Sequence, residues 1–67
     1  MKIRVNSDLK ELVDGKFLTD LLIQLNLDGR RGIAIAVNET VVRKSEWNAF
    51  ELKENDQVIV IEATQGG

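Results

Sequence analysis

The chain opens with a segment in which polar and apolar residues alternate. Within residues 2–6, Ile3 and Val5 occupy every second position, a pattern typical of a strand with one buried face. Residues 6–8 are Asn-Ser-Asp and offer a turn, and a second short strand is expected around residues 9–13, closed by Asp14-Gly15. The first thirteen residues therefore predict a β-hairpin.

A different period follows between residues 18 and 25. Four leucines fall at the i, i+3, i+4, i+7 spacing of one helical face, and the positions between them are mainly polar. These leucines are Leu18, Leu21, Leu22 and Leu25. Asp20 lies in the first turn, where a negative charge suits the helix dipole. We expect one helix here, with Gly29 and Gly32 in the connection that follows it.

The second half of the chain predicts three more strands. Residues 33–37 form a continuous apolar run, residues 40–42 a second short one, and residues 57–62 a third after a polar turn at residues 54–56. Between them lies an irregular stretch in which Trp47 is expected to pack at the edge of the core. The order strand, strand, helix, strand, strand, strand predicts an α+β roll, with a sheet of about five strands packed on one helix.

The composition narrows the chemistry available to the chain. Sixty-seven residues make one domain, and Cys and His are both absent, as is Tyr. The chain therefore has neither disulfides nor a Cys-ligated zinc site, and it lacks the usual general base and the usual metal ligands. The remaining carboxylates, lysines and hydroxyls show no catalytic spacing. We expect no catalytic residue and no metal site.

The charge pattern gives no sign of a nucleic-acid or membrane partner. The net charge is −2, and the two basic pairs, Arg30-Arg31 and Arg43-Lys44, sit beside turn residues, where we interpret them as solvated loop charges. No apolar run is long enough to span a membrane, and the first residues lack the apolar region of a signal peptide. The expected location is the cytoplasm.

The chain ends in Gly66-Gly67 directly after a strand. Two residues without a Cβ allow an extended backbone to enter a channel too narrow for side chains. The alternatives are a frayed terminus or a remnant of expression. We expect a folded domain at residues 1–63 and a flexible tail at residues 64–67, which spans roughly 13–14 Å when extended.

This order of elements, this length and the Gly-Gly end together resemble the β-grasp, ubiquitin-like fold, and above all the ThiS family, the sulfur carriers of thiamin biosynthesis. The resemblance covers essentially the whole chain. The matching pieces are the opening strand, residues 20–22 at the helix start, residues 34–38, 41–42, 45–47 and 56–59, and the final 65–67.

Two positions depart from the family pattern. Phe17 stands where the family often has Ser or Thr as the helix N-cap, and Arg43-Lys44 stands where it has Pro-Arg. The first change removes a cap worth about 1 kcal/mol, which Phe17 is expected to recover in part by packing against the helix. The second affects the rigidity of a turn and leaves the tail unchanged.

The resemblance implies a reaction at the C-terminus. ThiS-like carriers are adenylated at the residue corresponding to Gly67 by a ThiF-like enzyme that uses Mg-ATP. Sulfur from a cysteine persulfide supplied in trans then gives a thiocarboxylate, which a ThiG-like thiazole synthase consumes. Gly67 is thus expected to carry the chemistry, with Gly66 and Gln65 giving clearance, and no cofactor is held permanently.

The last strand is apolar on both faces although one helix covers only one of them. By analogy with ubiquitin-like proteins we place four residues under the helix, namely Val58, Val60, Ile35 and Val37. Four others then lie on the open face, namely Ile59, Ile61, Ala34 and Ala36, as a docking patch for the activating enzyme and the synthase. Loops folded over this face and a homodimer are the alternatives.

Three other functions share parts of this pattern. A molybdopterin-synthase small subunit has the same fold and tail, but its approach to Gly-Gly usually contains Pro, which this chain lacks entirely. A ubiquitin-like modifier would join Gly67 to lysines of other proteins. A plain interaction module would not need Gly66 and Gly67.

Overall fold

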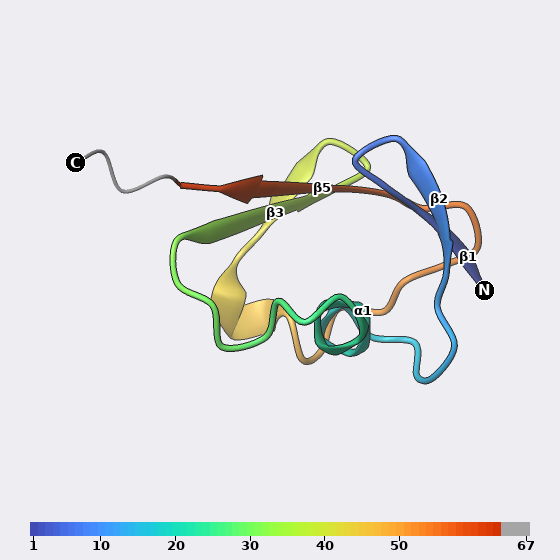
Figure 1. Ribbon diagram of the computed structural model, residues 1–67, viewed down its shortest axis with the longest axis horizontal. Helices are drawn as coiled ribbons and strands as arrows, with labels where there is room; N and C mark the ends of the chain where they lie inside the picture. Colours follow the sequence, from blue (N-terminus) through green and yellow to red (C-terminus); the bar gives the residue numbers. More distant parts are fainter. Residues whose placement is uncertain (64–67) are drawn as a thin grey trace.

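The computed structural model describes residues 1–63 of the chain. It contains a mixed sheet of five strands in the order β2-β1-β5-β3-β4, with the helix α1 lying across one face (Figure 1). The elements are β1 (Lys2–Val5), β2 (Asp8–Glu11), α1 (Leu18–Gln24), β3 (Ile33–Val37), β4 (Thr40–Val42), the 3-10 turn η1 (Lys44–Glu46) and β5 (Gln57–Glu62). The predicted α+β roll is confirmed, and β5 lies at its centre, parallel to β1 and antiparallel to β3.

The N-terminal hairpin is confirmed, but its second strand is shorter than predicted. Asn6 and Ser7 both have positive φ, 49° and 77°, which suits a two-residue hairpin turn. The prediction that β2 reaches residue 13 was wrong, because the strand ends at Glu11. Leu12 turns into the core, and the N–H of Val13 donates to Gln24 Oε1 at 2.9 Å, so the chain leaves the sheet toward the helix.

The helix α1 begins at Leu18 without a side-chain cap from Phe17, because the apolar ring of Phe17 has no oxygen that could accept a hydrogen bond. The carboxylate of Asp20 compensates by accepting hydrogen bonds from the N–H groups of Lys16 (3.0 Å) and Phe17 (2.9 Å). Gly15 has φ +83°, and a Cβ there would collide with the Asp20 carboxylate. The entry to the helix therefore depends on a glycine and an acidic residue together.

The end of α1 follows a recognisable hydrogen-bond pattern. Asn26 adopts the left-handed conformation with φ 61°, and the N–H of Leu27 donates to the carbonyl of Leu22 at 2.8 Å. This is the Schellman arrangement, with Asn in the position that Gly usually takes. It ends the helix at Gln24 and turns the chain toward β3.

The core lies between α1 and the sheet. Leu18, Leu21 and Leu22 are buried, which confirms the predicted helix face. The sheet contributes Ile3, Val5, Ile35, Val37, Val42 and Val58, and the connecting segments contribute Leu12, Trp47 and Leu52. The Trp47 indole N–H donates to the Val42 carbonyl at 2.9 Å, so Trp47 is structural, as predicted. Within residues 1–63, no helix has the length and apolar character required to cross a membrane.

Candidate functional site

The face of the sheet opposite α1, which we call the open face, carries exposed apolar side chains. Along β5, Val58 is fully buried, whereas Ile59 is 41% exposed and Ile61 is 58% exposed. The register places Ile59 opposite Ala36 and Ile61 opposite Ala34, so these four side chains are direct cross-strand neighbours. Of the residues predicted to lie under the helix, Val58, Ile35 and Val37 are buried and Val60 is partly buried. The docking role of the other four residues stays a prediction.

A fifth residue extends this surface, and sequence reasoning missed it. Val41 lies opposite Ala36 in the β3–β4 pair and is 73% exposed. In the run Thr40-Val41-Val42 either valine suits a buried position, and only the register shows that Val42 faces the core. We call the five residues the open-face patch: Ala34, Ala36, Val41, Ile59 and Ile61. These apolar side chains lie next to one another on three neighbouring strands, β4, β3 and β5.

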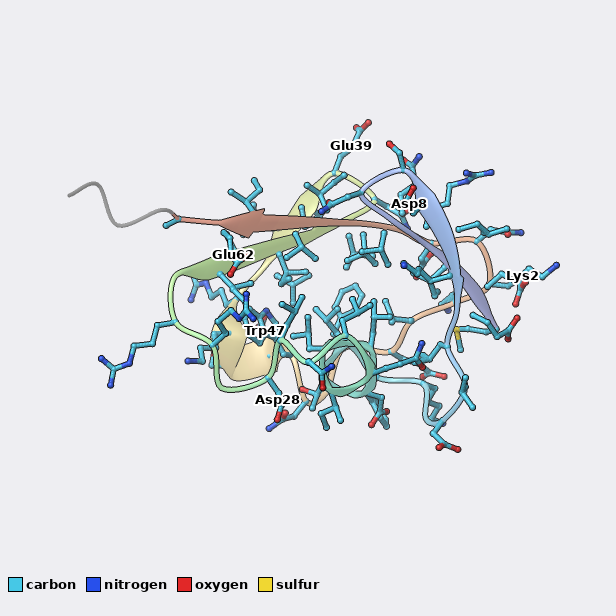
Figure 2. The ribbon with its side chains drawn as sticks, in the orientation of Figure 1. Lys2, Asp8, Asp28, Glu39, Trp47 and Glu62 are labelled. Atoms are coloured by element: carbon cyan, nitrogen blue, oxygen red, sulfur yellow. The ribbon has the colours of Figure 1, made fainter. Side chains whose placement is uncertain are left out.

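Two acidic residues lie at the turns of the two hairpins. Asp8 follows the β1–β2 turn and Glu39 lies in the β3–β4 turn, and both are exposed. Figure 2 shows Glu39 on the side of the sheet away from α1 and Asp28 and Trp47 on the helix side. The register pairs Asp8 with the buried Val5, so Asp8 belongs to the face that α1 covers. The β3–β4 turn beside the open-face patch therefore carries one exposed carboxylate, that of Glu39.

The end of β5 is fixed on the β3 side. The N–H of Ala63 donates to the carbonyl of Gly32 at 2.7 Å, and Gly32 has φ +74°, a conformation that favours glycine. The Arg30 guanidinium pairs with the Glu62 carboxylate at 2.6 Å, both side chains being about half exposed. Arg30, predicted to be a solvated loop charge, is exposed as expected but is also ion-paired. These contacts hold the chain in place immediately before its last four residues.

On its other side, β5 pairs with β1 at first and then bonds one side chain. The pairing of β1 with β5 ends at Val5 and Val58, and the amide of Asn6 then bonds the backbone of Val60 twice. Val60 N–H donates to Asn6 Oδ1 at 2.8 Å, and Asn6 Nδ2 donates to the Val60 carbonyl at 3.2 Å. The Asn6 amide therefore replaces one residue of a neighbouring strand. Sequence reasoning had placed Asn6 at the end of the first strand and the start of the turn, with no contact to β5.

The predicted reactive end lies beyond the described part of the chain. Gly67, and the clearance residues Gln65 and Gly66, are outside residues 1–63, so their roles remain predictions. Within residues 1–63 no group of three His, Cys, Asp or Glu side chains is arranged to hold a metal ion. The one clear pKa shift there belongs to Glu11, whose pKa is lowered by a hydrogen bond from the N-terminal amine and by its charge.

Comparisons with known proteins agree with this architecture. The family model described as "ThiS family" matches residues 3–67. The sulfur carrier protein ThiS of Escherichia coli (strain K12) is 27% identical over 67 residues, which cover the whole of both chains. The crystal structure of the thiamine biosynthesis protein ThiS from Geobacter metallireducens superimposes with a TM-score of 0.81 at 26% identity, again over the full length of both chains.

These matches extend from the first strand to the final Gly-Gly pair and include every element of the sheet. They account for the β-grasp arrangement of five strands on one helix. The chain belongs to the ThiS family of sulfur carrier proteins.

Proposed function

We propose that this protein carries sulfur as a thiocarboxylate on Gly67 and donates it for the thiazole ring of thiamin. The observation that supports this most is the family match, which runs through residue 67 and so includes the Gly-Gly end. The thiamine biosynthesis protein from Geobacter metallireducens, similar over its full length, supports the choice of pathway.

The proposed chemistry starts from an unreactive group. The C-terminal carboxyl is ionised at neutral pH, and a carboxylate is a poor electrophile. A partner enzyme with Mg-ATP would let a carboxylate oxygen of Gly67 attack the α-phosphorus, releasing pyrophosphate and leaving an acyl-adenylate. The acyl carbon then has AMP as its leaving group.

Sulfur would enter at that acyl carbon. The terminal sulfur of a cysteine persulfide attacks, AMP leaves, and the product is an acyl disulfide. A second thiol attacks the cysteine sulfur of this disulfide, forming a new disulfide and releasing the thiocarboxylate of Gly67. Each step uses groups of the partner proteins and one carboxyl group of the carrier. A carrier is not itself a catalyst, and the absence of Cys and His from the chain is compatible with that role.

The geometry of the described residues suits delivery of the tail. Residues 64–67, extended, reach roughly 13–14 Å beyond Ala63, enough to enter a buried site while the domain stays outside. We assign the open-face patch to docking of both the adenylating enzyme and the thiazole synthase. Ile59 and Ile61 lie on the strand that leads directly into the tail, so a partner bound there is next to the point where the tail begins.

The test is adenylation of Gly67→Val and Gly66→Val variants by the adenylating enzyme of the same cells. The release of pyrophosphate measures the rate. We expect both variants to keep the wild-type circular dichroism and melting temperature and to lose most of the adenylation rate, because the added side chains obstruct a narrow channel. Adenylation of Gly67→Val at the wild-type rate would contradict the proposal.

The pathway is tested separately with the charged protein. Thiocarboxylate on Gly67 is expected to support thiazole formation by the thiazole synthase. It is expected not to support molybdopterin formation when the large subunit of molybdopterin synthase replaces that enzyme. The reverse result would assign the protein to the other pathway.

A further inference from the structure

The backbone groups of β5 point alternately toward its two neighbouring strands, as in any antiparallel ladder. On the β3 side, the N–H of Ala63 donates to Gly32, and the carbonyl of Gln57 accepts from the N–H of Asn38 at 2.8 Å. The odd-numbered residues of β5 therefore direct their N–H and C=O groups toward β3.

The even-numbered residues point the other way, toward β1. The carbonyl of Val58 accepts from the N–H of Asn6 at 3.0 Å, and both backbone groups of Val60 are bonded by the Asn6 amide. Glu62 is the next even residue, so its N–H and C=O point to the same side, one step beyond Asn6. Because β1 ends at Val5, no strand within residues 1–63 pairs with Glu62 there.

The arrangement in space agrees with this assignment. Figure 1 shows β5 continuing toward the C-terminus past the turn of the β1–β2 hairpin, with β3 beside it on the other side. The Glu62 side chain lies on the helix side of the sheet, where Arg30 pairs with it (Figure 2). The backbone of Glu62 is therefore an open sheet edge that its own side chain does not cover.

Natural proteins usually protect such edges. The outer strand β4 has only three residues, and the outer strand β2 has three charged residues among its four. At Glu62 the charged side chain points to the helix side and pairs with Arg30, so it does not cover the backbone groups of the edge. Unpaired edges of this kind accept an extended segment of another protein, with main-chain hydrogen bonds providing the recognition.

We propose that this edge is a second docking site, at which an extended segment of the enzyme acting on Gly67 adds as a strand beside Glu62. The inference rests on the proposed function, because it takes that enzyme as the partner. The open-face patch supplies apolar contact area, whereas the added strand fixes the direction in which the tail leaves the domain. Asn6 sets the position where the added strand begins, since its amide occupies the edge up to Val60.

The alternation of hydrogen bonds supplies a selective test. In Glu62→Pro the lost N–H is the one that faces the open edge, and proline is tolerated at such positions. The bonds of Ile61 and Ala63 to the β3 side remain. Glu62→Ala is the matched control, because it loses the same ion pair with Arg30 but keeps the N–H.

We expect Glu62→Pro to be adenylated about tenfold more slowly than Glu62→Ala, or worse, since the proline alone loses a hydrogen bond and places a ring on the edge. The rate is measured at carrier concentrations well below KM, where it reports binding as well as turnover, after circular dichroism shows that both variants are folded. Equal rates for Glu62→Pro and Glu62→Ala would overturn the inference.

Amide hydrogen exchange provides a measurement on the unaltered protein. The N–H of Glu62 is expected to exchange rapidly in the free protein and at least about tenfold more slowly when the adenylating enzyme is bound without ATP. Exchange at Glu62 that stays equally fast in the complex would overturn the inference, even if adenylation is normal. Protection at Glu62 without any adenylation of the wild type would instead overturn the proposed function and leave the strand pairing supported.

Discussion

The two faces of the sheet carry similar residues that differ in burial and in role. On β5, Val58 and Val60 face the helix and Ile59 and Ile61 face away from it, yet all four are β-branched and apolar. Burial depends on whether another element covers the face. The helix α1 covers the face of the two valines, whereas the isoleucines are accompanied on their face only by alanines and Val41 of the neighbouring strands. The covered face stabilises the fold, and the open face keeps apolar surface that the fold itself does not require.

The largest expected effect is on the free energy of unfolding, which should fall much more for a change on the covered face than for one on the open face. Ile35 is 1% exposed, so Ile35→Ala should lower the free energy of unfolding by about 2–5 kcal/mol. Ile61→Thr keeps a β-branched side chain at an exposed position and should change it by no more than about 0.5 kcal/mol. Urea unfolding followed by circular dichroism measures both. Similar losses for the two variants would show that the open face is covered in solution.

The next effect is on the affinity for the adenylating enzyme, which should depend on the open face. Ile61→Asp should weaken binding of the adenylating enzyme by about 2 kcal/mol or more, because it places a charge at the centre of an apolar contact. Val13→Asp is the control, since Val13 is 74% exposed but lies beside α1, away from the open-face patch. Titration calorimetry with each folded variant measures the difference. Equal weakening by both changes would argue against docking on the open face.

A smaller effect concerns the helix that covers the buried face. Gly15→Ala should lower the free energy of unfolding by about 2 kcal/mol, since it strains a left-handed residue and displaces the Asp20 carboxylate from the helix start. Gly29 has a similar positive φ, 77° against 83°, but open space around it, so Gly29→Ala should cost less. Thermal unfolding of the pair measures the contribution of the Asp20 contact. Equal losses would show that backbone strain alone matters.

The smallest effect lies at the hairpin corner of the sheet. The N-terminal amine lowers the pKa of Glu11 by donating a hydrogen bond at 2.7 Å and by its charge. A lowered pKa means that the contact stabilises the protein above the ordinary carboxyl pKa and is lost as pH falls through the lowered one. Glu11→Gln should therefore reduce the acid-induced fall in melting temperature slightly, since the pair is exposed. An identical pH profile for Glu11→Gln would show that the ion pair adds nothing.

The sequence predicted secondary structure correctly where the spacing of apolar residues fitted only one kind of element. The leucines of α1 and the apolar runs of β3 and β5 predicted these elements to within one residue, and the alternation in β5 predicted its two faces. The end of β2 was wrong because Leu12 and Val13 are apolar for a different reason: Leu12 packs into the core from a connection, and Val13 lies exposed beside α1.

Other features depend on contacts between distant segments and have no local signal. The Asn6 amide reaches Val60 across 54 positions of sequence, and the exposed position of Val41 follows only from its pairing with Ala36. Asp20 was predicted to favour the helix dipole, but its hydrogen bonds to the N–H groups before the helix depend on the turn at Gly15. Register and turn geometry, rather than composition, determine these parts of the candidate site.

The most direct test of the carrier function is the intact mass of the protein after incubation with the adenylating enzyme, Mg-ATP and a persulfide donor. The account predicts a gain equal to the mass difference between one sulfur and one oxygen atom, and a further gain with a thiol alkylating reagent. Because the chain has no Cys, such alkylation reports the thiocarboxylate. A variant lacking Gly67 is the control. An unchanged mass, with an enzyme active on another ThiS protein, would contradict the account.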